Sequence, residues 1–557
     1  MRVPYTHAIP ERLPKIHCCR RTAIFTLCAL LSSNSIIAAE AQFCPNVYRK
    51  GVLKAPFNVA FLHVQSFDDP DGGKSEGLLM SSFFNAVKDA DGIKLERLEQ
   101  RDLVARIPDL DAIDMDKFDG NLDIEVLTDL DGVSRQVWPN ETARVPDGVL
   151  PFEAIVSPQG FLSTARPGRL TLINLDDPER SEYVVDQSTF VPPRCAPGSS
   201  DNQPWFYHDA RFIDMDDDGL RDLVTVRSSL IARGGFCPPS GQLVWFRNPG
   251  EELNQETEWE EHVLVDVDPK PGGPASNINA HDFDGDGIAE IVATHFFKYD
   301  AITIYGAPAG KRWADVDPAN GLFVRQKDIM RGQGNPFAVE IVDLNRDGRV
   351  DVLTSNHQGD QCFKVTKTDM PGRAIAIEQP ADGKIFTSDW QVHVIKDNIR
   401  ATPTFPEPER GPGRLAPNRA VAFWPERSMQ DAAKPWIVLG GDEAAKVWIL
   451  KPASPAPADW NYHSAVIFDI NDYYGPDTTQ SLMNDPQGIS ISTIGGLSWR
   501  YDEPGPDGMA EFFLPVFEGR DIHVIGFRGP LNGRPLGCPA DIYPACPQPR
   551  ADIARFP

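Results

Sequence analysis

Several short motifs that mark common enzyme classes are missing from this chain of 557 residues. The sequence has no GxSxG nucleophile elbow, no HExxH zinc helix, no phosphate-binding loop and no GxGxxG dinucleotide fingerprint. These absences argue against the commonest serine hydrolases, zinc proteases and nucleotide-dependent enzymes. The sequence specifies no catalytic residue, and it favours a protein that is not an enzyme.

Clustered basic residues are missing as well. The chain has 54 Lys and Arg against 80 Asp and Glu, which gives a formal net charge of −26 at pH 7. Binding to nucleic acid phosphates requires clustered cations, so nucleic acid is not an expected partner. The acidic excess is most simply a solvated surface.

The apolar run near the N-terminus is too short to cross a bilayer. Arg20 and Arg21 precede this run over residues 22–31, and small residues follow up to Ala41. The order of charged, apolar and small residues is typical of a secretory signal. Because the stretch before the run is long, twin-arginine export stays open as an alternative. We predict a signal peptide over residues 1–41, no transmembrane segment in the mature chain, and a secreted protein that is periplasmic if bacterial.

One acidic pattern of eleven residues occurs three times. It reads DMDDDGLRDLV from Asp214, DFDGDGIAEIV from Asp282 and DLNRDGRVDVL from Asp343. Oxygen-bearing side chains at positions one, three, five and nine can turn toward one point, because glycine at position six permits a sharp bend. Oxygen ligands in such a loop suit Ca²⁺. With position seven included, the predicted ligands are Asp214, Asp216, Asp218, Leu220, Asp222, Asp282, Asp284, Asp286, Ile288, Glu290, Asp343, Asn345, Asp347, Arg349 and Asp351.

A strand signal follows each acidic loop. Apolar, mostly β-branched residues occur at 223–226, 291–292 and 352–353, where an EF-hand would need a helix. An acidic loop that precedes a strand, repeated along the chain, resembles the FG-GAP or VCBS repeat family. In that family calcium-loaded hairpins decorate the blades of a β-propeller like that of the integrin α-subunit head. The resemblance implies an all-β propeller with about three structural Ca²⁺ ions.

The repeats predict seven blades, with eight as the alternative. A four-stranded blade has two apolar faces, so neighbouring blades must stack around an axis to bury them. Candidate blades occur near Phe57, Asp114, Phe152, Asp214, Asp282, Asp343, Trp436 and Asp502. Seven blades follow if the first strands complete the last blade. We predict a propeller over residues 42–530 and a Pro- and Cys-rich tail over 531–557; the sequence leaves metal binding open at the degenerate loops 114–123 and 502–511.

Six cysteines remain once the signal is removed, and an even number in an exported chain favours disulfides. They are Cys44, Cys195, Cys237, Cys362, Cys538 and Cys546. Cys195 and Cys237 flank the first acidic loop and form one expected pair. Either Cys538 pairs with Cys546, or Cys44 forms a bridge to one of them.

Three further residues have positions that suggest a role. Asn140 begins the acceptor sequon NET and is expected on a polar loop, where it would be glycosylated in a eukaryotic host. His295 and His357 follow the second and third acidic loops and are expected at the ends of the next strands. Strand ends in a propeller often face the central funnel, where a ligand can bind. Ordinary turn histidines are the alternative.

Two functions remain open from the sequence. The resemblance to integrin-type and lectin-like propellers implies a secreted binding module for an extracellular protein or glycan, and we favour this function. The alternative is an extracellular enzyme, a lyase or dehydratase acting on sugars, that uses the propeller funnel. Converging His, Arg and carboxylate groups in the funnel would favour the enzyme, whereas a flat loop face with exposed aromatic residues would favour the binding module. The sequence determines neither the ligand nor the oligomeric state.

Overall fold

The computed structural model describes residues 43–69, 72–83, 102–113, 122–128, 136–160, 168–187, 190–191, 203–229, 240–267, 274–296, 300–357, 370–401, 416–474 and 493–527. All of them belong to one unit, which spans residues 42–557. The predicted signal peptide, the predicted tail, most of the degenerate loop at 114–123 and the predicted disulfide cysteines other than Cys44 lie outside these residues. The corresponding predictions therefore stay predictions.

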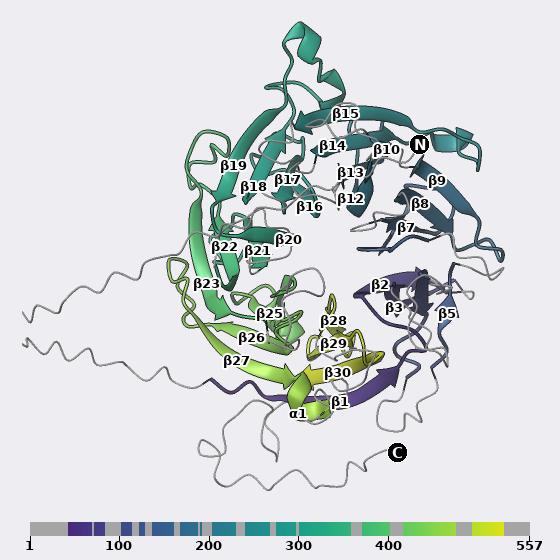
Figure 1. The fold of residues 1–557 in the computed structure, drawn as a ribbon. Coiled ribbons are helices and arrows are strands. Elements are labelled where there is room, and N and C mark those ends of the chain that lie inside the picture. The colour runs from purple at the N-terminus through teal and green to yellow at the C-terminus, as the bar shows by residue number, and fades with distance from the viewer. Residues whose placement is uncertain are drawn as a thin grey trace, which may run out of the picture. The chain divides into compact units, whose positions relative to one another are not determined.

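Seven four-stranded antiparallel sheets surround a central axis as the blades of a β-propeller (Figure 1). Blade 1 contains β2 (Phe61–Asp68), β3 (Lys74–Ser82), β4 (Leu103–Ile107) and β5 (Glu125–Val126); blade 2 contains β6 (Ala143–Arg144), β7 (Ala154–Pro158), β8 (Arg169–Asn174) and β9 (Glu182–Gln187); blade 3 contains β12 (Phe206–Ile213), β13 (Asp222–Ser229), β14 (Ser240–Arg247) and β15 (Glu260–Val267). Blade 4 contains β16 (Ile278–His281), β17 (Glu290–His295), β18 (Ala301–Gly306) and β19 (Arg325–Arg331); blade 5 contains β20 (Asn335–Val342), β21 (Asp351–His357), β22 (Gly372–Glu378) and β23 (Gln391–Ile399). Blade 6 contains β24 (Ala420–Phe423), β25 (Trp436–Gly440), β26 (Lys446–Pro452) and β27 (Tyr462–Asp469); blade 7 contains β28 (Ser498–Tyr501), β29 (Ala510–Val516), β30 (Asp521–Phe527) and β1 (Val47–Lys54).

Little other regular structure occurs in the described part of the chain. A two-stranded ribbon joins β10 (Phe190–Val191) to β11 (Gln203–Pro204), and α1 (Ile470–Tyr474) follows β27. Short 3-10 turns lie at Gly250–Glu252, Trp313–Asp315, Pro318–Asn320 and Arg427–Met429. No helix among the described residues is long and apolar enough to cross a membrane.

The first strand of the described chain closes the ring. β1 pairs with β30 from Val47 with Phe527 to Lys54 with Asp521, so blade 7 takes one strand from the N-terminal side and three from the C-terminal side. This confirms the prediction of seven blades. An N-terminal strand completes the last blade, as expected, but the eight candidates become seven because those near Phe57 and Asp114 form one sheet.

The candidate blade near Asp114 is not a separate blade. β4 and β5 flank this segment, and both belong to the sheet of blade 1. The acidic stretch gave a strong local signal, but the pairing of the flanking strands with β3 and with each other decides which sheet they join.

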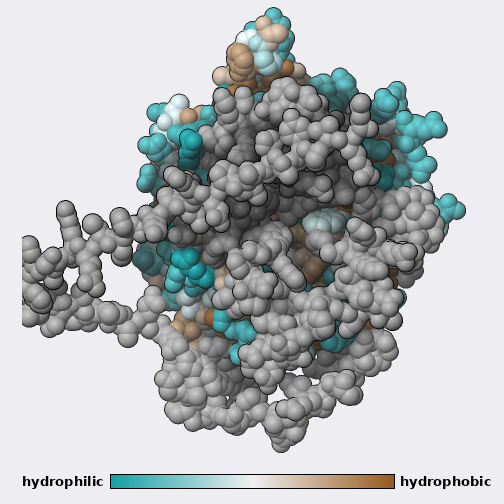
Figure 2. All heavy atoms as spheres, viewed as in Figure 1, coloured by the Kyte–Doolittle hydropathy of each residue, from teal (hydrophilic) through white to brown (hydrophobic). Residues whose placement is uncertain are grey.

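Burial differs systematically across each blade. The second strands β13, β17 and β21 are buried along their whole length, because each has neighbouring strands in its own sheet and neighbouring blades on both faces. The outermost strand β23 has many exposed residues. Figure 2 shows mainly hydrophilic residues along the outer rim of the ring. Each second strand therefore forms the middle of its blade, and polar residues cover the periphery.

Each interface between neighbouring blades has its own apolar cluster. For example, Val224 and Leu243 of blade 3 pack with Ile291 and Tyr305 of blade 4. Corresponding clusters join the other six pairs of neighbours, including blade 7 with blade 1. The core is thus a ring of interfaces, and each blade is stabilised on both sides by its neighbours.

The closing strand should contribute strongly to stability. Leu53 of β1 is fully buried against Phe513, Ile522 and Val524 of blade 7. Replacing a buried leucine by alanine removes apolar contacts and leaves a cavity, so Leu53→Ala should lower the free energy of unfolding by about 2–5 kcal/mol. Chemical denaturation measures this change. Val263→Ala on β15, where the side chain is 42% exposed, is the control and should change stability little; equal effects would contradict this role of β1.

Candidate functional site

The three acidic loops occupy equivalent hairpins in consecutive blades. They connect β12 to β13, β16 to β17 and β20 to β21, and position nine begins the second strand in each case. The glycine at position six has φ of 89° in Gly219, 89° in Gly287 and 88° in Gly348. Residues with side chains rarely adopt this conformation. The prediction that glycine makes the bend and that each loop leads into a strand is confirmed.

The first loop gathers three carboxylates. One oxygen from each of Asp214, Asp216 and Asp218 lies within 4.8 Å of the other two. Backbone N–H groups hold the first of these side chains, because Asp217 and Gly219 donate to its two oxygens at 2.7 and 3.0 Å. The loop thus brings together three of its five predicted ligands.

Position nine of the first loop has a different environment. Asp222 is buried, and its two oxygens accept the N–H groups of Met215 and Asn248 at 2.9 and 2.8 Å. This side chain therefore ties the loop to the end of β14. Burial raises the pKa of Asp222 to about 6, and Asp216 and Asp218 act in the same direction. A bound cation would offset this accumulation of negative charge.

The second loop is the best-formed cage. Asp282, Asp284 and Glu290 each place an oxygen within 4.8 Å of the others. Glu290 is fully buried; its Oε2 accepts the N–H of Phe283 at 3.0 Å, whereas its Oε1 has no hydrogen-bond donor among the described residues and lies 3.6 Å from Nη2 of Arg325. Burial raises the pKa of Glu290 to about 8. A buried carboxylate oxygen without a donor is an observation that a hard divalent cation would explain.

The third loop departs from the other two. Position three is Asn345, whose Nδ2 donates to Asp347 Oδ2 at 3.1 Å, and Arg349 forms an ion pair with the same carboxylate. Asp351 accepts the N–H groups of Leu344 and Gln379, both at 3.1 Å. Arginines compensate part of the negative charge in all three loops, because Arg247 lies 2.9 Å from Asp216 in the first loop and Arg325 lies 3.7 Å from Asp284 in the second. What sets the third loop apart is the amide of Asn345 at position three. The predicted residues are adjacent, but this loop fits a cation less well than the second loop.

Positions five and seven behave alike in all three loops. The N–H of position seven donates to the carboxylate of position five, with distances of 2.8, 2.9 and 3.0 Å in chain order. The three pairs are Leu220 with Asp218, Ile288 with Asp286, and Arg349 with Asp347. This shared hydrogen bond keeps the three hairpins in one conformation although their sequences differ.

In the degenerate loop at 502–511 of blade 7, basic side chains pair with the carboxylates. Lys50 Nζ lies 3.0 Å from Asp502 Oδ2 and 2.7 Å from Glu511 Oε2, and Arg500 pairs with Glu511 at 3.1 Å. Glu511 corresponds to position nine. Within the described residues, side-chain ammonium and guanidinium groups compensate these two carboxylates.

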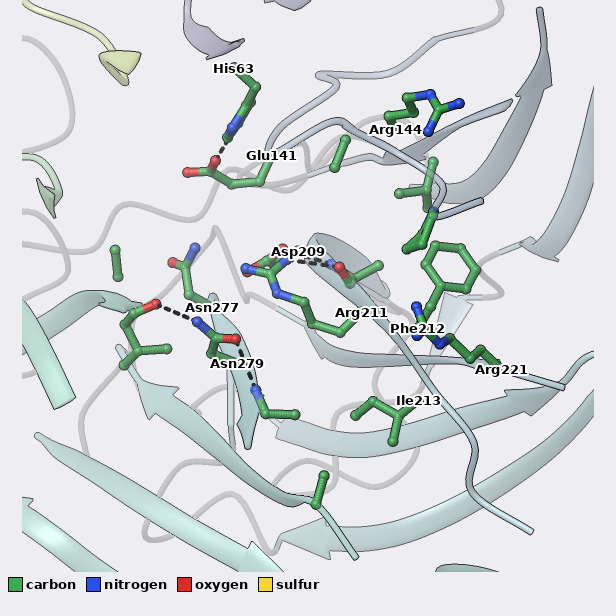
Figure 3. A pocket seen from close by; sticks show the side chains of 18 of the residues that line it. His63, Glu141, Arg144, Asp209, Arg211, Phe212, Ile213, Arg221, Asn277 and Asn279 are labelled. Atoms are coloured by element: carbon green, nitrogen blue, oxygen red, sulfur yellow. Dashed lines mark hydrogen bonds and ion pairs between the residues drawn. The ribbon is translucent and has the colours of Figure 1, made fainter. Parts of the chain in front are cut away.

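A cavity of about 560 Å³ lies where the inner strands surround the axis. Its walls come from β2, β6, β12, β16 and β20, together with the segment that precedes β24 (Figure 3). Five blades therefore supply residues from β-strands, and a sixth supplies a residue from the turn before its first strand. A site built on so many rigid strands is well suited to holding a small ligand.

The side chains of His63, Glu141 and Arg419 meet in the cavity wall. His63 Nε2 lies 2.7 Å from Glu141 Oε2, and Arg419 Nη1 lies 3.1 Å from the same oxygen. Glu141 is only 5% exposed. Burial alone would raise its pKa, but Arg419 and His63 hold the pKa well below its usual range. Glu141 is therefore an ionised carboxylate, and its Oε1 has no hydrogen-bond partner in the described part of the chain.

A second polar group comes from blades 3 and 4. Asp209 pairs with Arg211, and it also accepts the N–H of Ala210 at 2.9 Å. Asn277 is 4% exposed, and its Oδ1 has no partner among the residues that the structure describes. Figure 3 shows these side chains and Asn279 on the cavity wall facing Glu141. The cavity wall thus contains both hydrogen-bond donors and acceptors, and two acceptors, Glu141 Oε1 and Asn277 Oδ1, are buried without a donor among the described residues.

Aromatic side chains close the opposite end of the axis. Phe61 and Phe206 lie at the first residues of β2 and β12 and pack with Phe296 and Phe337. The acidic loops follow the last residues of the inner strands, so the polar cavity and the aromatic cluster lie toward opposite ends of these strands. The cavity extends to the acidic loops, because Asp214, Arg221 and Ala289 of these loops line it.

The two histidines predicted for a funnel site do not line this cavity. His357 is buried and stacks on Phe337 with ring centroids 4.4 Å apart. His295 is buried, and its Nε2 lies 3.0 Å from the hydroxyl of Tyr305. Both stand at strand ends as expected, but packing against aromatic rings takes them away from the polar part of the axis.

Asn140 is not on an exposed loop. It is 1% exposed, and its Nδ2 donates to the carbonyls of Trp138 and Tyr207 at 2.9 and 3.2 Å. The sequon is therefore not accessible to a glycan in the folded protein, which corrects the expectation of a polar surface loop. The next residue in the sequence, Glu141, lines the cavity.

Sequence reasoning missed the cavity residues. His63, Glu141 and Arg419 come from three blades that are distant in the sequence, and no local pattern joins them. Asp209 and Asn277 had a detectable signal, because each stands five residues before the first aspartate of its loop. Alignment of the loops would have placed both residues at the same point of the inner strand.

The sequence matches no model of a known protein family and no curated protein. Among solved structures, the chain is similar to an auxiliary nutrient binding protein from Bacteroides thetaiotaomicron, with 8% sequence identity and a TM-score of 0.33. The match covers 86% of this chain and 100% of that protein.

The buried histidine in the aromatic cluster should make the protein sensitive to acid. Burial lowers the pKa of His357 to about 3, from 6.5 for an exposed histidine, and the nearby His208 acts in the same direction. Below pH 6.5 the unfolded chain takes up a proton that the folded chain does not, so stability falls as the pH drops toward 3.

His357→Phe should remove this contribution, which amounts to about 1.4 kcal/mol per pH unit at most. Urea unfolding at pH 7 and pH 5 measures the difference. The variant should lose less stability between the two values than the wild type, whereas the control His463→Phe, outside the cluster, should behave like the wild type. An identical loss in all three proteins would contradict the assignment.

Proposed function

We propose that the protein is a secreted, calcium-stabilised β-propeller that binds a glycan, or a similar hydroxylated molecule, in its central cavity. The cavity supports this proposal because polar side chains from several blades surround a concave space of ligand size. The main support comes from Asn277 Oδ1 and Glu141 Oε1, two buried acceptor oxygens without a donor among the described residues. A buried acceptor without a donor costs free energy, and a ligand hydroxyl would satisfy it.

A protein partner is supported less well by these features. Protein interfaces are typically broad surfaces with aromatic and arginine residues at their centre. The polar groups described above converge inside a concavity that is closed at one end by Phe61, Phe206 and Phe337. A small ligand, or the end of a longer chain, fits such a space.

The proposed role of Ca²⁺ is to hold the hairpins at the cavity entrance. Asp214 belongs to the first loop and also lines the cavity. The carboxylate clusters of the first and second loops support ion binding there, and Glu290 supports it most strongly. Neutralising these clusters would stiffen the hairpins that carry the ends of β12 and β16.

Catalysis in the same cavity is a second candidate function. His63, Glu141 and Arg419 converge, and a histidine oriented by a carboxylate is an arrangement that general acid–base catalysis uses. A lyase or dehydratase acting on a sugar would use these groups. Turnover of a bound glycan, detected as an unsaturated product, would distinguish this candidate from binding alone.

Removal of calcium should destabilise the protein. Folded loops that bind an ion gain stability by mass action, so the mature protein should melt several degrees lower in EGTA than in excess CaCl₂. Differential scanning calorimetry measures the shift. Asp282→Ala should reduce the shift, whereas the exposed Asp389→Ala should not. Identical melting temperatures with and without calcium would refute the structural role of the ion.

Asn277→Ala tests the cavity itself. The side-chain oxygen has no hydrogen bond within the described structure, so its removal should change the melting temperature little. Loss of an acceptor for a ligand hydroxyl should weaken binding about tenfold, as expected for a hydrogen bond in a buried site. The measurement is a glycan array followed by calorimetric titration of the best binder. Asn320→Ala, outside the cavity, is the matched control, and equal affinities for the two variants would contradict the proposed site.

A further inference from the structure

We propose that the ligand of the central cavity is an acidic saccharide, one whose sugar units carry carboxylate groups. This inference rests on the proposed function, because it names the chemical class of the ligand for the same cavity. The support comes from the arginine residues that line the cavity, some of which form ion pairs with carboxylates while others have donors available to a ligand.

The cavity has more cationic groups than carboxylates although the chain is strongly acidic. Four arginines line it, against the three carboxylates of Glu141, Asp209 and Asp214, and His63 adds a cation only when it is protonated. The whole chain has a net charge of −26. At physiological salt the Debye length is about 8 Å, so groups within the cavity decide the local potential more than the distant surface does.

Arg221 is the arginine with no internal counter-charge. Its side chain is exposed, and neither an ion pair nor a side-chain hydrogen bond is found for it among the described residues. Its backbone is nevertheless anchored, because its carbonyl accepts a hydrogen bond from Asn248 Nδ2 at 3.1 Å. Arg221 is position eight of the first acidic loop and lines the cavity, so its guanidinium lies beside the cavity and is available to an anion.

Arg419 lies deeper and is only partly used. Its Nη1 contacts Glu141, which His63 shares. A guanidinium has five N–H donors, and no nitrogen of Arg419 is both buried and without a partner. The other donors are therefore reachable from the cavity or from solvent. The remaining two arginines, Arg144 and Arg211, are paired with carboxylates.

The charges in the cavity predict how the ligand is oriented. Ionised Glu141 would repel a carboxylate near the deep end, but its Oε1 and the Oδ1 of Asn277, which are buried without a donor in the free protein, would accept hydrogen bonds from hydroxyls when these side chains turn toward the ligand. Arg221 at the entrance would pair with a carboxylate. A ligand with hydroxyls at one end and an acid group at the other, as in a uronic acid, matches both regions.

The test compares an oligogalacturonide with the same oligosaccharide after reduction of its carboxyl groups. The two probes differ only in charge and in one oxygen per unit. Calorimetric titration of the full mature protein should give at least tenfold tighter binding for the acidic probe. Arg221→Gln should reduce the ratio of the two affinities about tenfold. Arg331→Gln on the outer strand β19 is the matched control and should leave both affinities unchanged.

The possible outcomes separate this inference from the function on which it rests. Binding of both probes with equal affinity, or preference for the neutral probe, would overturn the acidic ligand and leave the glycan-binding function standing. Binding of neither probe would count against both. A preference for the acidic probe that survives Arg221→Gln would overturn the role of Arg221.

Discussion

The structure depends on burying both faces of every blade. A single four-stranded sheet of this composition exposes two apolar surfaces, and stacking against two neighbours is the arrangement that covers both. Seven interface clusters accomplish this, and the interface of blades 7 and 1 requires β1 to pair with β30. Ring closure therefore joins the two ends of the described chain and fixes the positions of the inner strands around the axis.

Those inner strands face one another across a narrow space, so the residues at their two ends acquire different roles. Phenylalanines at one end fill the axis and exclude water. Polar residues toward the other end cannot all find partners within their own blade, and several reach across to another blade. Arg419 and Glu141 are the clearest case, because 278 positions separate them in the chain. The cavity is a consequence of this difference between the two ends.

In several blades the hairpin between the first and second strands has the same backbone shape, but the negative charge of its carboxylates is compensated in different ways. In blades 3 and 4 the carboxylates cluster, and in blade 4 a buried oxygen of Glu290 has no donor among the described residues. Arg247 in blade 3, Arg325 in blade 4 and Arg349 in blade 5 pair with loop carboxylates, and in blade 7 Lys50 comes from β1 to do so. Repulsion between neighbouring carboxylates must be offset in every case, but the compensating group differs from blade to blade.

The sequence by itself determined the class of the fold and the three loops, because these depend on local patterns, and it limited the blade number to seven or eight. Glycine at position six and the apolar run after position nine act within a dozen residues. It did not determine that His357 would pack on Phe337, that Asn140 would be buried, or that the strands beside Asp114 would join blade 1. These outcomes, like the meeting of His63, Glu141 and Arg419, depend on contacts between blades. Only closure of the ring brings such distant residues together, and for that reason the tertiary structure alone decided the candidate site.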